Sequence, residues 1–483
     1  MKYFIGLDLG TTVVKASLFD EEGVFISDSA IEQQLIYLSN GFIEQDASRW
    51  YSDAVSVITE VISNGRIRGS DVAGLSISSQ GITIVPVDGN YRPLRNAINW
   101  LDSRPKSEIQ SLIDGVGRER LTELTGKPAI PGYSVPQLMW IRNHEPDIFG
   151  KARWFMMPMD FLMAKLTGVS LTDHSMAAGS LGYSIARMDW SDEILDAAGL
   201  DKMRFPNLAW AGQPVGTLSR QAASDTGLSA GCVVGVGGQD QKVAAFGARI
   251  EQGIATCSMG TCGAFEFLLT SPTPHPRNQL TLCPYLEKNH WVMEGCINSF
   301  GGAIKWLRDT ICQGSSYQDM DAEAARSQAG AGGVLFYPFL TTMGTPHTVS
   351  SRLAGFENLR LNTNRADLIH AVYESLAYEC RLNLEAAVPY TGAITQLNVF
   401  SGGSRSDILC QMIADVTRYT VCAFDFSEMG SLGAARLAAK ACGMDWQTFG
   451  DGLLAKQRRY VPGDSADDYE RFFMEYRKGL GQN

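Results

Sequence analysis

The chain has 483 residues, of which 45% are hydrophobic and 19% are charged, a composition typical of globular proteins and unlike that of disordered, fibrous or membrane proteins. The formal net charge of -11 argues against nucleic acid or an anionic membrane as the main partner, because both attract basic surfaces. A single hydrophobic core stops growing near ~250–300 residues, so we expect two domains with a cleft between them.

The ten cysteines are scattered and lack the paired spacing of a zinc site. The closest pair, Cys257 and Cys262, has no histidine nearby, so we expect reduced core thiols. The amino-terminal segment MKYFIGLDLG carries Asp8 and lacks a sustained apolar stretch, which argues against a signal peptide. No apolar run approaches the ~20 residues of a membrane span, and the expected location is cytoplasmic.

The chain opens with a predicted β-hairpin, in which residues 3–9 and 13–19 flank the turn Gly10-Thr11-Thr12. Residues 254–269 repeat this pattern around Gly260-Thr261, and Gly260 follows Gly10 by 250 positions. A repeat at domain spacing predicts two similar α/β halves, each opening with a hairpin.

Between the hairpins, residues 74–88 are predicted to form two strands, and residues 104–227 are richer in helical patterns. Residues 232–248 are typical of a buried strand, a glycine turn and the start of a helix. Later segments predict helices at 300–311 and 366–387, then a strand and another helix around 397–410. We expect the domains to be residues 1–248 and 249–483.

Both Gly-Thr turns could bind phosphate, because glycine lets an anion approach the backbone N–H groups. Asp8, at the end of the first strand, could hold a hydrated Mg²⁺, which needs only one or two carboxylates alongside phosphate oxygens. The alternative is a plain hairpin turn with a capping aspartate. Two matching copies favour the phosphate interpretation.

The segment Gly237-Gly238-Gln239-Asp240-Gln241 places a carboxylate at a strand-to-helix turn, where the helix amino terminus keeps it ionised. An ionised Asp240 could accept a hydroxyl proton, although an aspartate at this place is most often a helix N-cap.

Two further motifs could bind the substrates. Gly402-Gly403 follows a predicted strand and could lie against a flat heterocycle. Trp100 and Asp102 combine an aromatic face with a carboxylate, which suits a polyol, although a structural salt bridge beside a core tryptophan is an equal alternative. The spaced fingerprints of a P-loop and of a dinucleotide-binding fold are both missing.

In chain order, these motifs resemble those of the FGGY carbohydrate kinases of the actin-like ATPase superfamily, from residue 3 to about residue 460. The matching segments are IGLDLGTTVVKASLFDEEG, FIEQDASRWY, AINWLDSRP, GGQDQKVAAFGA, SMGTCGAF, FGGAIKWLRDTI, LNVFSGGSRSDILCQMIADVTRYTV and EMGSLGAARLAA. So many motifs in one order are hard to obtain by chance.

The resemblance implies an α/β fold of two ribonuclease H-like domains around a central cleft, which close over ATP, Mg²⁺ and a sugar or polyol. It implies that Asp240 is the general base and that Asp8 binds the metal, and a homodimer is also expected. The residues expected to contact ATP are Gly10, Thr11, Thr12, Lys15, Gly260, Thr261, Gly302, Gly402, Gly403 and Ser404. Those expected to contact the sugar, besides Asp240, are Gln80, Gly81, Trp100, Asp102, Tyr133 and Gln241.

The sequence indicates the substrate less specifically than it indicates the family. Where glycerol kinases carry Arg-Glu and xylulose kinases carry Met-His, this chain has Gly81-Ile82. We expect ATP-dependent phosphorylation of a pentulose such as xylulose; the alternatives are another ketose or polyol, such as ribulose, erythritol or glycerol. A non-catalytic sensor of the same fold is disfavoured because a pure binder needs no base, and an oxidoreductase is disfavoured by the missing dinucleotide fingerprint.

Overall fold

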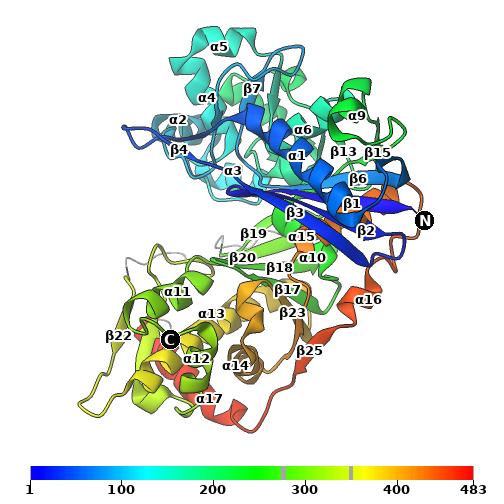
Figure 1. Ribbon diagram of the computed structural model, residues 1–483. Coiled ribbons are helices and arrows are strands. Elements are labelled where there is room, and N and C mark those ends of the chain that lie inside the picture. Colours follow the sequence, from blue (N-terminus) through cyan, green and yellow to red (C-terminus); the bar gives the residue numbers. More distant parts are fainter. Residues whose placement is uncertain (1, 274–278, 348–351, 482–483) are drawn as a thin grey trace.

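The computed structural model describes residues 2–273, 279–347 and 352–481. The chain is a mixed α/β protein built on two seven-stranded sheets, one from each half of the sequence (Figure 1), so the predicted fold class is confirmed. Within the described ranges, no helix is both long enough and apolar enough to cross a membrane.

The first sheet has the order β14-β15-β6-β1-β2-β3, and β16 also pairs with β6. Its strands are β1 (Tyr3–Leu9), β2 (Val13–Asp20), β3 (Phe25–Glu32), β6 (Val72–Ser79), β14 (Pro214–Thr217), β15 (Val233–Gly235) and β16 (Gly238–Gln239). β1 runs antiparallel to β2 and parallel to β6. The carboxyl ends of β1, β6 and β16 therefore meet at one edge of the sheet.

The second sheet has the order β19-β20-β18-β17-β23-β24-β25. Its strands are β17 (Ile254–Met259), β18 (Gly263–Leu269), β19 (Thr281–Pro284), β20 (Trp291–Ile297), β23 (Gln396–Phe400), β24 (Thr420–Phe424) and β25 (Gln457–Tyr460). β17 runs antiparallel to β18 and parallel to β23, as β1 does to β2 and β6. The same hairpin-plus-parallel-strand arrangement in both sheets confirms the predicted duplication.

Short strands lie outside the two sheets. They are β4 (Ile36–Tyr37), β5 (Ile43–Gln45), β7 (Val85–Val87), β8 (Ala97–Ile98), β9 (Trp154–Met156), β10 (Leu171–Asp173), β11 (Tyr183–Ser184), β12 (Asp189–Trp190), β13 (Asn207–Ala209), β21 (Leu335–Tyr337) and β22 (Gly355–Glu357). Most of them pair in twos, and β4, β5 and β8 form a three-stranded sheet.

The helices of the first half are α1 (Ala47–Gly65), α2 (Lys106–Val116), α3 (Arg118–Thr125), α4 (Ser134–His144), α5 (Pro146–Lys151), α6 (Pro158–Thr167), α7 (His174–Ala178), α8 (Asp192–Ala198), α9 (Arg220–Thr226) and α10 (Asp240–Gly247). Those of the second half are α11 (Phe300–Thr310), α12 (Tyr317–Ala324), α13 (Arg365–Thr391), α14 (Asp407–Thr417), α15 (Met429–Ala441), α16 (Asp451–Leu454) and α17 (Ala466–Gly479). Four short 3₁₀ helices are η1 (Gly69–Asp71), η2 (Lys202–Arg204), η3 (Ala331–Gly333) and η4 (Gly402–Arg405).

Helix α15 comes late in the sequence but packs on the first sheet, against β1 and β6, and on α10 (Figure 1). A Cβ added at Gly6 of β1 would lie 1.8 Å from the carbonyl oxygen of Ser431, and one at Gly433 would lie 2.0 Å from that of Val243. Helix α1 covers the other face of the sheet, where Leu18 contacts Gly65, so the central strands are buried on both faces. The predicted domain boundary at residue 248 remains a prediction. Helix α15 follows that boundary in the sequence but packs on the sheet of the first half.

The contact at Gly6 predicts a large loss of stability for Gly6→Ala. The new methyl group must displace the backbone of α15, and overpacking of this kind costs about 3 kcal/mol. The measurement is the midpoint of urea unfolding, with Gly89→Ala as the matched control, because a Cβ at Gly89 meets nothing within 4 Å. Equal midpoints for the two variants would contradict the direct backbone contact.

Candidate active site

Two carboxylates flank the end of β6. Asp8 is in register with Ser78 across the β1–β6 pair, and Gly238 is in register with Ser78 from the other side. The Ser78 hydroxyl donates to Asp8 Oδ1 over 2.8 Å, and Asp240 follows the short strand β16 as the first residue of α10. Ligands of open α/β sheets bind at such carboxyl ends, and the sequence motifs 232 positions apart are brought together here.

Helix α15 supplies the other side of the Asp8 environment. A Cβ at Gly430 would lie 3.1 Å from Asp8 Oδ2, so any other residue at this position would crowd that oxygen. Lys15 is in register with Asp8, and its Nζ lies 2.7 Å from Glu428 Oε2. Burial raises the pKa of Asp8 to about 6, the Ser78 hydrogen bond opposes this shift, and the Glu428 charge adds to it.

Asp240 is partly exposed and does not cap its helix. The N-cap is Gln239, whose side chain accepts from the backbone N–H of Lys242, so the N-cap alternative is wrong for Asp240. Its Oδ1 accepts the N–H of Gln241 over 2.7 Å. Burial, and next the negative charge of Asp8, raise the pKa of Asp240 to about 7. At neutral pH the carboxyl group can therefore both accept and release a proton.

Hydrogen bonds connect the first phosphate turn to the expected sugar side. The indole Nε1 of Trp100 donates to Thr11 Oγ1 over 3.0 Å, and that hydroxyl donates to Gln80 Oε1 over 3.1 Å. Gln80 is only 2% exposed, whereas Trp100 is 42% exposed. The ring of Trp100 can therefore contact a ligand, while Gln80 holds the turn and the ring in place. Tyr133 is 6% exposed, and burial with the nearby Glu294 charge raises its pKa.

Gly81 lies in a strained turn beside this network. The N–H of Thr83 donates to the carbonyl of Gly81 over 2.8 Å, and Ile82 between them has a φ of 72°. A β-branched residue rarely adopts this conformation, and a γ-turn with positive φ is strained. The hydroxyl of Ser134 donates to the carbonyl of Ile82 over 2.5 Å and helps to hold the turn. Strain of this kind concentrates at functional sites.

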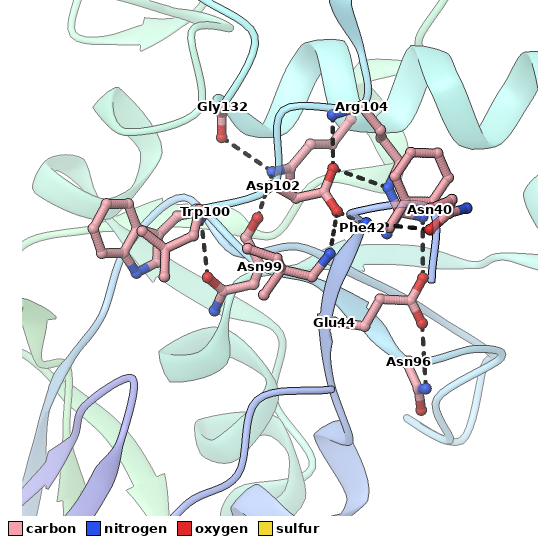
Figure 2. Close-up of polar contacts among 12 residues, drawn as sticks. Asn40, Phe42, Glu44, Asn96, Asn99, Trp100, Asp102, Arg104 and Gly132 are labelled. Atoms are coloured by element: carbon pink, nitrogen blue, oxygen red, sulfur yellow. Dashed lines mark hydrogen bonds and ion pairs between the residues drawn. The ribbon is translucent and has the colours of Figure 1, made fainter. Parts of the chain in front are cut away.

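Asp102 differs from the expectation that it contacts the sugar. Its carboxylate accepts the N–H of Ile43 over 2.6 Å and the guanidinium of Arg104 over 2.8 Å, and its side chain is 0% exposed. Arg104 also bonds to Glu44 Oε1 over 3.0 Å. Figure 2 shows the Trp100 ring turned away from this cluster. Because Asp102 has no free surface, it stabilises the loop that presents Trp100, as the salt-bridge alternative held.

A cavity of about 390 Å³ lies at the carboxyl ends of β17 and β23. It is lined by Met259, Gly260, Thr261, Gly301, Ile304, Lys305, Tyr317, Gln318, Asp321, Tyr373, Gly402, Gly403, Arg405 and Ser406. A Cβ at Gly402 would meet nothing within 4 Å, so this position faces open space. Ser401, just before it, has a φ of 74°, a strained conformation that aims the glycine turn.

The remaining residues expected to contact ATP lie in or behind this cavity wall. The N–H of Gly302 donates to the carbonyl of Thr261 over 3.0 Å and so attaches α11 to the Gly260-Thr261 turn. Ser404 is 1% exposed, and its hydroxyl donates to the carbonyl of Ser401 over 2.8 Å. Its side chain therefore supports the turn from behind and is not free to bind a nucleotide, which corrects the expectation.

The sequence interpretation missed a cluster of charges between the halves, in which Lys242 and Glu266 are buried and Glu294 is partly exposed. Lys242 comes two residues after Asp240. Its Nζ lies 3.1 Å from Oε1 of Glu266 in β18, and it also forms an ion pair with Glu294 of β20. Burial raises the pKa of Glu266 well above its ordinary value, whereas Lys242 lowers that of Glu294 to about 2 against the effect of burial. Glutamates inside otherwise apolar strands were the available signal, because unpaired charges are rarely buried.

Comparisons with known proteins show which family the chain resembles. Two family models match, described as the N-terminal and C-terminal domains of the FGGY family of carbohydrate kinases, over residues 3–247 and 255–442. A xylulose kinase of Bacillus subtilis (strain 168) is 28% identical over 444 residues, which are 92% of this chain and 89% of its own. A glycerol kinase of Renibacterium salmoninarum is 28% identical over 497 residues, covering 99% of this chain and 97% of its own.

Among solved structures, a ligand-bound xylulose kinase from Lactobacillus acidophilus has a TM-score of 0.92, with 24% identity over 100% of this chain and 99% of its own. It shows the same fold. Because the two family models cover well over half of the chain, this protein belongs to the FGGY family of carbohydrate kinases and is an ATP-dependent sugar kinase.

Proposed function

We propose that this kinase transfers the γ-phosphoryl group of ATP to a hydroxyl of a pentulose such as xylulose, with Asp240 as the general base. The observation that carries the proposal is a partly exposed carboxyl group with a pKa of about 7 at the carboxyl end of the first sheet. The relatives named xylulose kinase support a pentulose, and the glycerol kinase keeps a smaller polyol as the alternative.

In the proposed step, the substrate hydroxyl gives its proton to Asp240 as its oxygen bonds to the γ-phosphorus. The bond from that phosphorus to the bridging oxygen breaks, and ADP leaves. Phosphoryl transfer depends on positioning and on charge neutralisation more than on covalent chemistry. Asp240 therefore has to hold the hydroxyl in line and remove one proton, which a carboxyl group with a pKa of about 7 can do at neutral pH.

The residues around Asp8 fit a magnesium ion. Asp8 is partly exposed, and its negative charge and that of Asp240 repel each other, a situation that a cation relieves. Mg²⁺ needs few protein ligands when phosphates and water supply the rest. When bound, it neutralises the charge that develops on the transferred phosphoryl group.

The two hairpin turns are suited to the phosphates. Thr11 and Thr12 offer backbone N–H groups, and Thr12 also offers a hydroxyl, whereas the N–H of Gly10 donates to the carbonyl of Val13 and shapes the turn. Lys15 adds a positive charge that Glu428 holds in place. Gly260 and Thr261 offer the same groups from the wall of the cavity, which has room for the adenosine of ATP. For the sugar, the exposed face of Trp100 can pack on C–H groups while Gln241 and Asp240 bind hydroxyls.

The first prediction concerns turnover. With ATP and Mg²⁺, ADP release should depend on one member of a panel of pentuloses, hexuloses, tetritols and glycerol. Asp240→Asn should lower kcat by about 10²–10⁴-fold, because the base is lost while the size of the side chain is kept. The thermal midpoint of the variant serves as the folding control. Sugar-dependent turnover that survives in Asp240→Asn would remove Asp240 from this role.

The second prediction concerns pH. Only the ionised form of Asp240 accepts a proton, and its pKa is about 7 before Mg²⁺ offsets the charge of Asp8. The value of kcat/KM for the sugar should therefore level off above about pH 7 and fall as the pH is lowered toward 5. Initial rates at saturating ATP and low sugar, between about pH 5 and 8, measure this profile. A flat profile across that range would exclude a base with this pKa.

The third prediction tests the nucleotide cavity. Gly402→Leu should raise the KM for ATP by roughly tenfold or more and leave the KM for the sugar unchanged, because the new side chain fills the cavity. Gly452→Leu is the matched control, since its Cβ also meets nothing within 4 Å and it lies outside the cavity lining. Equal KM values for ATP in the two variants would place the nucleotide elsewhere.

The homodimer and the cytoplasmic location remain predictions.

A further inference from the structure

One cysteine differs from the expectation of core thiols. Cys262 directly follows Gly260-Thr261 and is exposed, whereas Cys296 and Cys442 are partly buried and the other seven cysteines are buried. Its position places a reactive type of side chain next to a turn that we assign to phosphate binding. A second thiol lies within reach of it, so it is one member of a pair.

The two thiols meet across the β18–β20 pair. Gly263 is opposite Ile297, and Ala264 is opposite Cys296. Side chains alternate along a strand, so Cys262 and Cys296 lie on the same face as diagonal neighbours. Asn298 lies beside both: its carbonyl accepts from Cys262 Sγ over 3.1 Å, and its side-chain Oδ1 accepts from Cys296 Sγ over 3.1 Å. Asn298 therefore holds the two thiols side by side.

This arrangement makes Cys262 the more nucleophilic of the two. The neighbouring side chain of Cys296 lowers the pKa of Cys262 to about 7, against the effect of burial. The same contact raises the pKa of Cys296. The thiolate is the form that reacts with oxidants, and Cys262 is also the more exposed of the two, so Cys262 is the thiol that reacts first.

We propose that Cys262 and Cys296 form a peroxide-sensitive dithiol whose oxidation to a disulfide switches the kinase off. The Cys262 thiolate attacks hydrogen peroxide: an S–O bond forms, the O–O bond breaks, and hydroxide leaves as water after taking up a proton. The Cys296 sulfur then attacks the sulfenic acid: the S–S bond forms, the S–O bond breaks, and a second water leaves. Two thiols lose two electrons in total, and one peroxide gains them. A dithiol reductant reverses the change.

The disulfide would displace the phosphate turn. The two sulfur atoms must approach to about 2 Å, which removes both hydrogen bonds to Asn298. Cys262 adjoins Thr261, and the carbonyls of Gly260 and Thr261 accept from the N–H groups of Gly301 and Gly302 over 2.9 and 3.0 Å. Movement of Cys262 therefore also displaces the Gly260-Thr261 turn and the start of α11. Misplacement by about 1 Å can lower turnover on the order of 10²-fold.

The experiment treats the full-length protein with hydrogen peroxide and compares each variant with its own untreated activity. The wild type should lose turnover by roughly tenfold or more, recover it in dithiothreitol, and yield a Cys262–Cys296 cross-linked peptide by mass spectrometry. Cys296→Ser should not form the cross-link and should keep most of its untreated turnover, because the disulfide that switches the enzyme off cannot form. Cys442→Ser, which removes another partly buried thiol, should behave like the wild type.

The effect on turnover rests on the proposed function, but the cross-link and the affinity for ATP do not. If no sugar is phosphorylated, loss of ATP affinity together with the cross-link still supports the switch. The proposal is overturned if peroxide leaves the wild type active, if no Cys262–Cys296 peptide forms, or if Cys296→Ser loses as much turnover as the wild type. Reversible inactivation that disappears in Cys442→Ser would assign the sensitivity to a different thiol and would also overturn it.

Discussion

The close contact between α15 and the first sheet determines how the active site is assembled. Gly6 and Gly433 lack side chains, so the backbone of α15 lies directly on β1 and on α10. This contact brings Gly430 over Asp8 and Glu428 to Lys15. A segment more than 400 positions after the first hairpin thus completes the environment of the proposed metal ligand. A side chain at Gly6 would separate both contacts at once.

The electrostatics of the site follow from the same compact arrangement. Asp8 and Asp240 lie on either side of β6 with few compensating hydrogen bonds, and the pKa of each is raised. Two residues after Asp240, Lys242 joins the two halves through ion pairs with Glu266 and Glu294. A buried ion pair adds little stability but is costly to break. The cluster therefore fixes α10, and with it Asp240, against strands β18 and β20.

Much of the fold was predictable because its signals are local. The strand-turn-strand pattern around Gly10-Thr11 and again around Gly260-Thr261 predicted both hairpins, and the structure has them as β1–β2 and β17–β18. The helix that starts at Asp240 was predicted from the glycine turn before it. Asp102 and Ser404 were assigned to ligand contacts because the motif shows residue type and not direction. In the structure both side chains are buried and bond within their own loops, Asp102 to Arg104 and Ser404 to Ser401.

The sequence by itself determined the α/β class, the duplicated hairpins and the family motifs, because each depends on residues close together in the chain. Only the tertiary structure decided which distant groups meet. The pairing of Lys242 with Glu266 and Glu294, the contact of α15 with Asp8, and the approach of Cys262 to Cys296 all depend on strand register and helix packing. The physical reason is that register and packing are set by the burial of whole elements, to which residues far apart in the sequence contribute together.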